Sequence, residues 1–288
     1  MKTLHKPQWL NKKMDFESVA EVTRMLRTLK LHTVCEGARC PNISECFARS
    51  TATFMILGDV CTRNCSFCAI PQSKPLPPDP DEPRHVAEAA GQLALRHVVV
   101  TSVTRDDLPD GGAMQFALTI AEIKKRLPSA TIEVLIPDLK GVEASINMII
   151  DAKPHIINHN METVPSVFKR VRPMGNYATS LSLLKYVKSQ DAAIITKSGI
   201  MVGLGEIPDE VEHVMDDLRR CGCDVMTIGQ YLPPSSNHAL LREYVTPEQF
   251  ESYKIIALGK GFLYVASSPY VRSSYNAAED MDLIKKQL

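Results

Sequence analysis

Six of the eight cysteines lie between positions 35 and 68, where they form two groups of three. The first triplet has the spacing Cys-x4-Cys-x5-Cys, and the second has the tighter spacing Cys-x3-Cys-x2-Cys. Thiolates at such short spacing are ligands for soft metals, so these residues predict metal or cluster binding. The members are Cys35, Cys40 and Cys46 in the first triplet, and Cys61, Cys65 and Cys68 in the second.

Three kinds of cysteine site compete for this pattern. A disulfide framework is typical of short secreted chains, whereas 288 residues can bury a full hydrophobic core. Structural zinc takes four ligands, commonly as two close cysteine pairs, and each triplet is one ligand short. An iron–sulfur cubane held by three thiolates leaves one iron for a ligand other than cysteine, which accounts for both triplets. We expect Cys221 and Cys223, far from the triplets, to be packed thiols.

An open iron at the second triplet has a specific chemical use. It can chelate the amino and carboxylate groups of S-adenosylmethionine (SAM), and one electron then cleaves the sulfonium bond to release a 5′-deoxyadenosyl radical. The cofactor carries this chemistry, while the protein supplies placement and excludes water. The second triplet therefore predicts radical chemistry on SAM.

Short apolar strands alternate with amphipathic helices along the rest of the chain. Repeated strand–helix units of about 30 residues predict an α/β fold with a parallel sheet that closes partly or fully into a barrel. The expected strands are rich in Val and Ile and are bounded by Gly, Pro or Asp. They span Thr53–Leu57, His97–Ser102, Thr131–Ile136, His155–Asn158, Ala193–Thr196, Val225–Gly229 and Phe262–Ser267.

Two helices and one connection carry clear local signals. An apolar stripe with the spacing i, i+3, i+4 and i+7 begins at Val211, which predicts a helix with one buried face. A capping box begins at Thr246 and has proline at its first helical position. The proline-rich segment Lys74–Pro83 predicts a stiff loop after the second triplet.

The order of these elements places the chemistry at one end of the barrel. Cys61 follows the first expected strand, at the carboxyl end where barrel enzymes carry their active sites. The loops 104–112 and 158–163 follow two other strands and open on the same face. The first triplet precedes the first strand, so its segment must fold back over the barrel mouth.

Composition and charge exclude several classes of protein. The 33 basic and 33 acidic residues give no net charge, so we expect no nucleic-acid partner. The longest stretch without a charged side chain, Val225–Leu241, contains two prolines and polar residues, which excludes a lipid-spanning helix. The first ten residues lack the apolar core of a secretory signal, and we expect a cytoplasmic protein with no membrane partner.

The loop Gly58–Cys68 resembles the radical SAM superfamily, and its pattern Cys-Thr-Arg-x-Cys-x-Phe-Cys resembles more narrowly the lipoyl synthase family. Similar blocks cover most of the chain. They are Cys35–Cys46, Arg105–Gly112, His159–Thr163, Thr196–Glu206, Thr227–Leu232 and the Arg-Ser-Ser-Tyr-x-Ala pattern of Arg272–Ala277. The resemblance implies a partial (β/α)6 TIM-like radical SAM barrel at residues 51–268. It also implies an N-terminal extension, 1–50, with the auxiliary-cluster cysteines, and a short C-terminal segment, 269–288.

The same resemblance implies two 4Fe–4S clusters with different roles. Cys61, Cys65 and Cys68 correspond to the residues that hold the SAM-binding cluster. The first triplet corresponds to the ligands of an auxiliary cluster that donates sulfur, and Ser274 corresponds to its fourth ligand. A hard alkoxide matches a sulfide cluster less well than a thiolate, which suits an iron that is given up during turnover. Arg272 either offsets the charge of this serine or lies on the surface.

The residues that contact SAM are less clearly marked than the cysteines. Asp106, Asp107 and Glu162 either bind polar groups of SAM or are solvated loop acids. Gly203 and Gly205 either let the backbone approach the adenosyl group or form a tight turn, since the full dinucleotide fingerprint is missing.

Two positions depart from the family pattern. Gln115 stands where the family usually has histidine, and Pro233 and Pro234 stand in a segment that often has one proline. Neither departure touches an expected cluster ligand. They bring local contacts into question and leave the reaction class unchanged.

The resemblance implies insertion of two sulfur atoms, at carbons 6 and 8, into an octanoyl group bound to lysine of a lipoyl carrier protein. Carriers of this kind are the E2 subunits of 2-oxoacid dehydrogenases and the H protein of glycine cleavage. Electrons would come from a ferredoxin- or flavodoxin-like donor. Two alternatives stay open: a radical SAM tRNA methylthiotransferase, and a non-catalytic iron–sulfur carrier or electron-transfer protein.

Overall fold

A computed structural model describes residues 5–11, 16–48 and 52–285 of the chain. Within these ranges a single sheet has eight strands in the order β1 to β8. Seven of them, β2 to β8, are parallel, and β1 pairs with β2 in the antiparallel sense. The strands are β1 His32–Thr33, β2 Thr53–Ile56, β3 His97–Ser102, β4 Thr131–Leu135, β5 Ile156–Asn158, β6 Ile195–Val202, β7 Val225–Gln230 and β8 Tyr264–Ser267.

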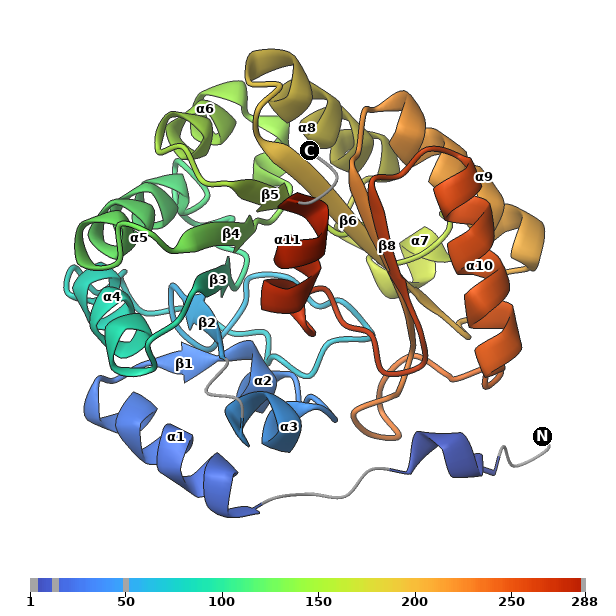
Figure 1. Cartoon of the computed structure of the whole chain (residues 1–288), viewed down its shortest axis with the longest axis horizontal. Helices are drawn as coiled ribbons and strands as arrows, with labels where there is room; N and C mark the ends of the chain where they lie inside the picture. The colour runs from blue at the N-terminus through green and yellow to red at the C-terminus, as the bar shows by residue number, and fades with distance from the viewer. Residues whose placement is uncertain (1–4, 12–15, 49–51, 286–288) are drawn as a thin grey trace.

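Helices on the outside connect successive parallel strands, and Figure 1 shows them as a ring around the curved sheet. The linear strand order describes an open barrel, which confirms the predicted α/β fold of six strand–helix units. The helices are α4 Glu82–Gln92, α5 Ala113–Arg126, α6 Glu143–Asp151, α7 Pro165–Val171, α8 Tyr177–Gln190, α9 Pro208–Arg220 and α10 Pro247–Gly259, with a 3-10 turn, η2, at Leu139–Gly141.

All seven expected strands are present, and one of them is much longer than predicted. The strand expected to end at Thr196 continues as β6 to Val202. Lys197 and Ser198 interrupt the apolar pattern in the sequence. The strand nevertheless continues through them, because both side chains are buried inside the barrel with polar partners. Strand β1 was not expected, since two residues are too short for a periodic signal.

The local helix signals are largely confirmed. The stripe that begins at Val211 is fully buried on α9, and Thr246 accepts the backbone N–H of Gln249 at the start of α10. The proline-rich loop ends earlier than expected, because α4 begins at Glu82 and takes Pro83 into its first turn. Proline is tolerated there because that N–H has no partner within the helix.

The extension before the barrel contains η1 Gln8–Leu10, α1 Phe16–Thr28, β1, α2 Val34–Gly37 and α3 Ile43–Ala48. It joins the sheet through β1, and α3 contacts the C-terminal segment. Tyr275 donates to Glu45 at 2.9 Å, and the Asn42 amide donates to the Tyr270 carbonyl at 2.7 Å. The first triplet is thereby brought next to the segment that carries Ser274. The division at residues 50 and 268 stays a prediction.

The last helix, α11 Ala277–Lys285, closes the amino end of the barrel. Met281 and Ile284 pack with Ile156, Ile195 and Val225, the first residues of three neighbouring strands. Figure 1 shows α11 in the centre of the ring.

No helix in the described ranges combines the length and apolar composition that a bilayer crossing needs.

A buried ion pair and its polar neighbours connect four strands inside the barrel. Glu133 on β4 is fully buried and lies 3.0 Å from the Lys197 ammonium on β6. His97 lies 3.3 Å from the same carboxylate, and the Asn158 amide donates to it at 3.0 Å. Burial opposes the charge of Glu133, but these partners more than offset it and lower its pKa to about 2.

Lys197→Met should therefore leave a buried carboxylate without its main cation. We expect the free energy of unfolding to fall by about 3–5 kcal/mol, as measured by urea denaturation. The double variant Lys197→Met/Glu133→Gln should recover most of this loss, because it removes both charges. Equal stability of the single and double variants would contradict the importance of this pair.

Candidate active site

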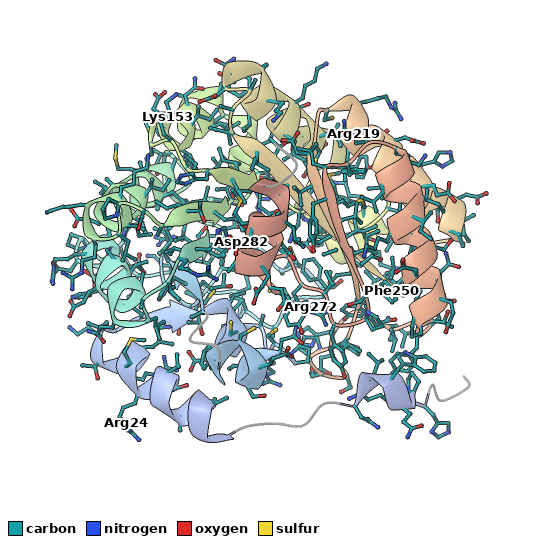
Figure 2. The ribbon with its side chains drawn as sticks, viewed as in Figure 1. Arg24, Lys153, Arg219, Phe250, Arg272 and Asp282 are labelled. Atoms are coloured by element: carbon teal, nitrogen blue, oxygen red, sulfur yellow. The ribbon has the colours of Figure 1, made fainter. Side chains whose placement is uncertain are left out.

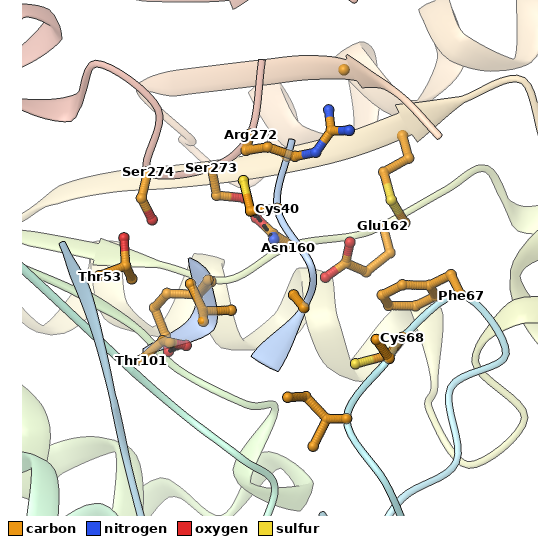
Figure 3. Close-up of a pocket in the computed structure, with 18 of the residues that line it drawn as sticks. Cys40, Thr53, Phe67, Cys68, Thr101, Asn160, Glu162, Arg272, Ser273 and Ser274 are labelled. Carbon is orange, nitrogen blue, oxygen red and sulfur yellow. Dashed lines mark hydrogen bonds between the residues drawn. The ribbon is translucent and has the colours of Figure 1, made fainter. Parts of the chain in front are cut away.

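A cavity of about 510 Å³ opens at the carboxyl ends of the parallel strands. It is lined by residues at the ends of β3 to β7 and by the extension and the C-terminal segment. Figure 3 shows Cys40, Ser273, Ser274 and Arg272 on one side, and Phe67, Cys68 and Glu162 on another. Both cysteine triplets line this cavity, which confirms that the N-terminal extension folds back to the barrel mouth.

The second triplet lies on a loop whose backbone is tied to the barrel. The N–H of Cys61 donates to the Pro71 carbonyl at 2.9 Å, which closes the loop around the other two cysteines. The Cys61 sulfur accepts the N–H of Thr104 at 3.3 Å, from the loop that follows β3. Within the loop, the N–H of Cys68 donates to the carbonyl of Cys65 at 3.0 Å.

Arg63 anchors this loop to two carboxylates of the barrel. It is 6% exposed and makes bidentate contacts of 2.6–2.9 Å with both Asp106 and Asp138. Burial opposes the charge of Asp138, but hydrogen bonds from Arg63 lower its pKa to about 2. Paired guanidinium–carboxylate contacts fix orientation as well as distance, so they hold the loop in one position relative to β3 and β4.

The structure separates the three acids predicted to contact SAM. Asp106 pairs with Arg63, and Asp107 pairs with the Arg105 guanidinium at 2.8 Å; neither lines the cavity. Glu162 does line it, and burial raises its pKa while Arg172 opposes this effect. A SAM contact by Glu162 stays a prediction, whereas the ion pairs of Asp106 and Asp107 argue for a structural role.

Gly203 and Gly205 form a tight turn after β6, with φ of 97° and 108°, and neither lines the cavity. A Cβ at Gly203 would lie 2.3 Å from the Gln230 amide nitrogen and 2.6 Å from the Glu243 carbonyl oxygen. These contacts explain the glycine without a ligand. Of the two interpretations, the structure favours the turn, and approach to the adenosyl group stays a prediction.

The first triplet lies on α2, on α3 and on the turn between them. Thr33 caps α2 by accepting the N–H of Glu36. The N–H of Cys40 donates to the carbonyl of Cys35 at 3.0 Å, and the N–H of Cys46 donates to that of Asn42 at 2.9 Å. These local bonds fold the x4 and x5 spacings so that the three thiols line one wall of the cavity.

The thiols of each triplet act on one another. Burial raises the pKa of Cys35 to about 12, and the neighbouring thiols of Cys40 and Cys46 add to this effect. Burial raises the pKa of Cys68 to about 12 in the same way, with contributions from Cys65 and Cys61. Thiolates crowded at such a place need a strong positive charge, which the irons of a cluster supply. The donor sets therefore fit iron–sulfur clusters.

A single metal ion fits less well. Each triplet supplies three thiols, whereas structural zinc takes four ligands, commonly as two close cysteine pairs. The remaining cysteines lie at the end of α9, outside the cavity. Cys223 is fully buried and Cys221 is half-buried, as expected for packed thiols.

The C-terminal segment places Ser274 and Arg272 in the cavity with the first triplet. Ser273 and Ser274 both line the cavity, and the Asn160 amide donates to the Ser273 hydroxyl at 2.7 Å. Figure 2 shows Arg272 within the body of the molecule, while Arg24 and Lys153 lie at its edge. Burial lowers the pKa of Arg272, and Cys40 faces it and opposes that effect. Arg272 is therefore part of the site.

Sequence reasoning missed the residue that lets this segment approach the sheet. A Cβ at Gly229 on β7 would lie 2.1 Å from the Val271 carbonyl oxygen. The signal was available, since glycine inside a strand often marks close approach of another backbone.

Sequence reasoning also missed Asn160 and Arg172 as residues of the cavity wall. The Arg172 guanidinium donates to the Asn160 carbonyl at 3.0 Å and so braces the partner of Ser273.

Comparisons with known proteins agree with this geometry. Residues 55–218 match the sequence model of the Radical SAM superfamily. A lipoyl synthase from Caldanaerobacter subterraneus subsp. tengcongensis is 57% identical over 98% of this chain and 99% of its own length. A lipoyl synthase from Nitratidesulfovibrio vulgaris is 54% identical over 96% of this chain and 92% of its own length.

Solved structures show the same fold at low sequence identity. Methylornithine synthase (PylB) has a TM-score of 0.53 and 12% identity, over 89% of this chain and 86% of its own. SuiB from Streptococcus suis, bound to S-adenosylmethionine, has a TM-score of 0.59 and 10% identity, over 87% of this chain and 60% of its own. These similarities support the fold alone.

Gly229→Ala should push Val271 away and loosen the segment that carries Ser274. Overpacking of this kind costs about 1–3 kcal/mol, so we expect faster hydrogen exchange in a peptide covering residues 268–276, measured by mass spectrometry. A peptide covering the second triplet should be unchanged.

Gly259→Ala is the matched control, because a Cβ there meets nothing within 4 Å. Its exchange over residues 268–276 should equal that of the wild type. If Gly229→Ala behaved like this control, close backbone approach at β7 would not determine where Ser274 lies.

Proposed function

Because the chain belongs to the lipoyl synthase family of radical SAM enzymes, we propose that it inserts sulfur at carbons 6 and 8 of a protein-bound octanoyl group to form the lipoyl cofactor. One observation carries this proposal: two cysteine triplets from separate segments line a single cavity. A radical generator and a sulfur donor must both reach the same carbon chain, so the reaction needs this arrangement.

Cys61, Cys65 and Cys68 would hold a 4Fe–4S cluster that binds SAM. When bound, this cluster and SAM supply a 5′-deoxyadenosyl radical, which can remove hydrogen from carbons that acid–base chemistry cannot activate. The chain's own residues position the loop: Arg63 fixes it to Asp106 and Asp138. Glu162 and Arg172 lie on the cavity wall, where they would contact the polar parts of SAM.

Cys35, Cys40, Cys46 and Ser274 would hold the auxiliary cluster, which we propose as the sulfur-donating substrate. Both Ser273 and Ser274 line the cavity, but Ser273 bonds to Asn160, so we assign Ser274 to the cluster. Arg272 faces Cys40 and would offset the negative charge of the thiolates and the serine alkoxide. A serine ligand on a short loop can leave without disturbing the three cysteines.

The rest of the cavity wall suits an octanoyl chain. Burying each methylene contributes about 0.8 kcal/mol, and an apolar wall also excludes water from the radical. The lining side chains that share this apolar character are Val34, Met55, Phe67, Ile70, Val103, Leu135, Ile136, Ile200, Met201, Tyr231 and Leu232.

We propose lipoyl carrier proteins as the macromolecular substrates, namely E2 subunits of 2-oxoacid dehydrogenases and the H protein of glycine cleavage. A ferredoxin- or flavodoxin-like protein would supply electrons. The relatives that match nearly the full chain are named lipoyl synthase, so the methylthiotransferase and electron-carrier alternatives have no comparable support.

Incubation with an octanoyl-lysine peptide, SAM and a reductant tests this division of roles. The wild type should release 5′-deoxyadenosine and form a lipoyl peptide, both followed by mass spectrometry. Cys35→Ala should still cleave SAM but form no lipoyl peptide, because it lacks a ligand of the sulfur donor. Cys61→Ala should do neither, because it lacks a ligand of the SAM-binding cluster.

Cys221→Ala is the control, since this thiol lies outside the cavity, and it should match the wild type. The assignment of roles is reversed if Cys35→Ala stops SAM cleavage and Cys61→Ala does not. Absence of 5′-deoxyadenosine from the wild type would instead support the electron-carrier alternative.

A further inference from the structure

Leu57 has an unusual backbone conformation at a critical point of the chain. It directly follows β2, and its φ of 69° lies in the left-handed region that favours glycine. For a residue with a side chain this conformation costs about 1–2 kcal/mol, so the surroundings must impose it. The chain turns here into the loop that begins at Gly58 and carries the second triplet.

Two buried charged side chains hold the backbone of Leu57 from opposite sides. The Glu82 carboxylate accepts its N–H through both oxygens, at 3.1 and 2.9 Å. The Arg105 guanidinium donates to its carbonyl at 3.3 Å. Glu82 is 7% exposed and Arg105 is 1% exposed, so water does not compete strongly for these bonds.

Each of these side chains is itself anchored to another element. Gln115 on α5 donates to the Glu82 carboxylate and to the Asp79 carbonyl, both at 2.9 Å. Arg105 is held by Asp107 at 2.8 Å. Gln115, which departs from the family pattern, therefore does not line the cavity but supports Glu82. The contacts connect α4, α5 and the loop after β3 to the two peptide units that flank the Cα of Leu57.

We infer that Glu82 and Arg105 are positioning residues that hold Leu57 in its left-handed conformation and thereby aim the second-triplet loop into the cavity. This inference rests on the proposed function, which assigns the SAM-binding cluster to that loop. Arg63 and the closure between Cys61 and Pro71 preserve the shape inside the loop. Loss of Glu82 should therefore change the direction in which the loop leaves β2, and leave its three cysteines able to bind iron.

Glycine adopts a positive φ without penalty, which makes a decisive test available. We expect Glu82→Ala to retain iron but to weaken SAM binding about tenfold, the equivalent of about 1.4 kcal/mol. SAM binding is measured by titration of the reduced cluster's electron paramagnetic resonance signal. In a Leu57→Gly background the same Glu82→Ala change should cost less than about threefold, because no strained residue is left to hold.

Glu88→Ala, a change at a partly exposed position of the same helix, is the matched control and should bind SAM like the wild type. If Glu82→Ala does not fold, Gln115→Ala replaces it, because it removes the donor that orients the Glu82 carboxylate. Its effect should again shrink in the Leu57→Gly background. A merely structural role of Glu82 predicts equal losses in both backgrounds, since glycine at position 57 cannot repair packing.

The outcomes separate this inference from the proposed function. A wild-type signal that does not respond to SAM would overturn the proposed function and, with it, this inference. A wild-type signal that responds, together with equal losses in the two backgrounds, would overturn the positioning role alone.

Discussion

Burial of thiols beside one another penalises their negative charge, and this constraint governs the site. The pKa of Cys35 and that of Cys68 are both raised to about 12, so the protein alone does not stabilise the thiolates that ligate metals. Cluster irons would supply the missing positive charge. Cys35 and Cys68 belong to different triplets, both triplets line one cavity, and the remaining wall is largely apolar. The scaffold must therefore hold two separate segments against the same strand ends before any cofactor binds.

Different contacts meet this demand on the two sides of the cavity. On the second-triplet side, charged groups hold a loop: Arg63 contacts two carboxylates, while Glu82 and Arg105 bind the backbone N–H and the carbonyl of Leu57. On the Ser274 side the fit is steric, because Gly229 leaves room for the backbone of Val271. A loop held by several contacts from charged side chains suits a cluster that stays in place. The C-terminal segment is held by this close approach and by hydrogen bonds at Tyr270, Ser273 and Tyr275, which are neighbours of Ser274, and this suits a ligand that must dissociate.

The sequence predicted the barrel, its seven parallel strands and the two triplets, because apolar periodicity and short cysteine spacing are local signals. It could not reveal that Asp106 pairs with Arg63, since that contact joins two loops that only the fold brings together. Nor could it reveal that Asp107 pairs with Arg105 two residues away, while the Arg105 guanidinium reaches the Leu57 carbonyl. The end of β6 was misjudged for a related reason: Lys197 looks like a strand terminator until Glu133 is placed opposite it. Position 57 gave no signal at all, because its conformation is imposed by Glu82 and Arg105.

The most direct test of the two-cluster account is iron and sulfide analysis combined with Mössbauer spectroscopy of the anaerobically reconstituted protein. Two cubanes predict about eight irons and eight sulfides per chain, with the spectrum of one cluster changing when SAM is added. Cys35→Ala should leave the SAM-responsive half of that spectrum intact. A protein with about four irons, or one that binds only zinc, would contradict the claim that two clusters share this cavity.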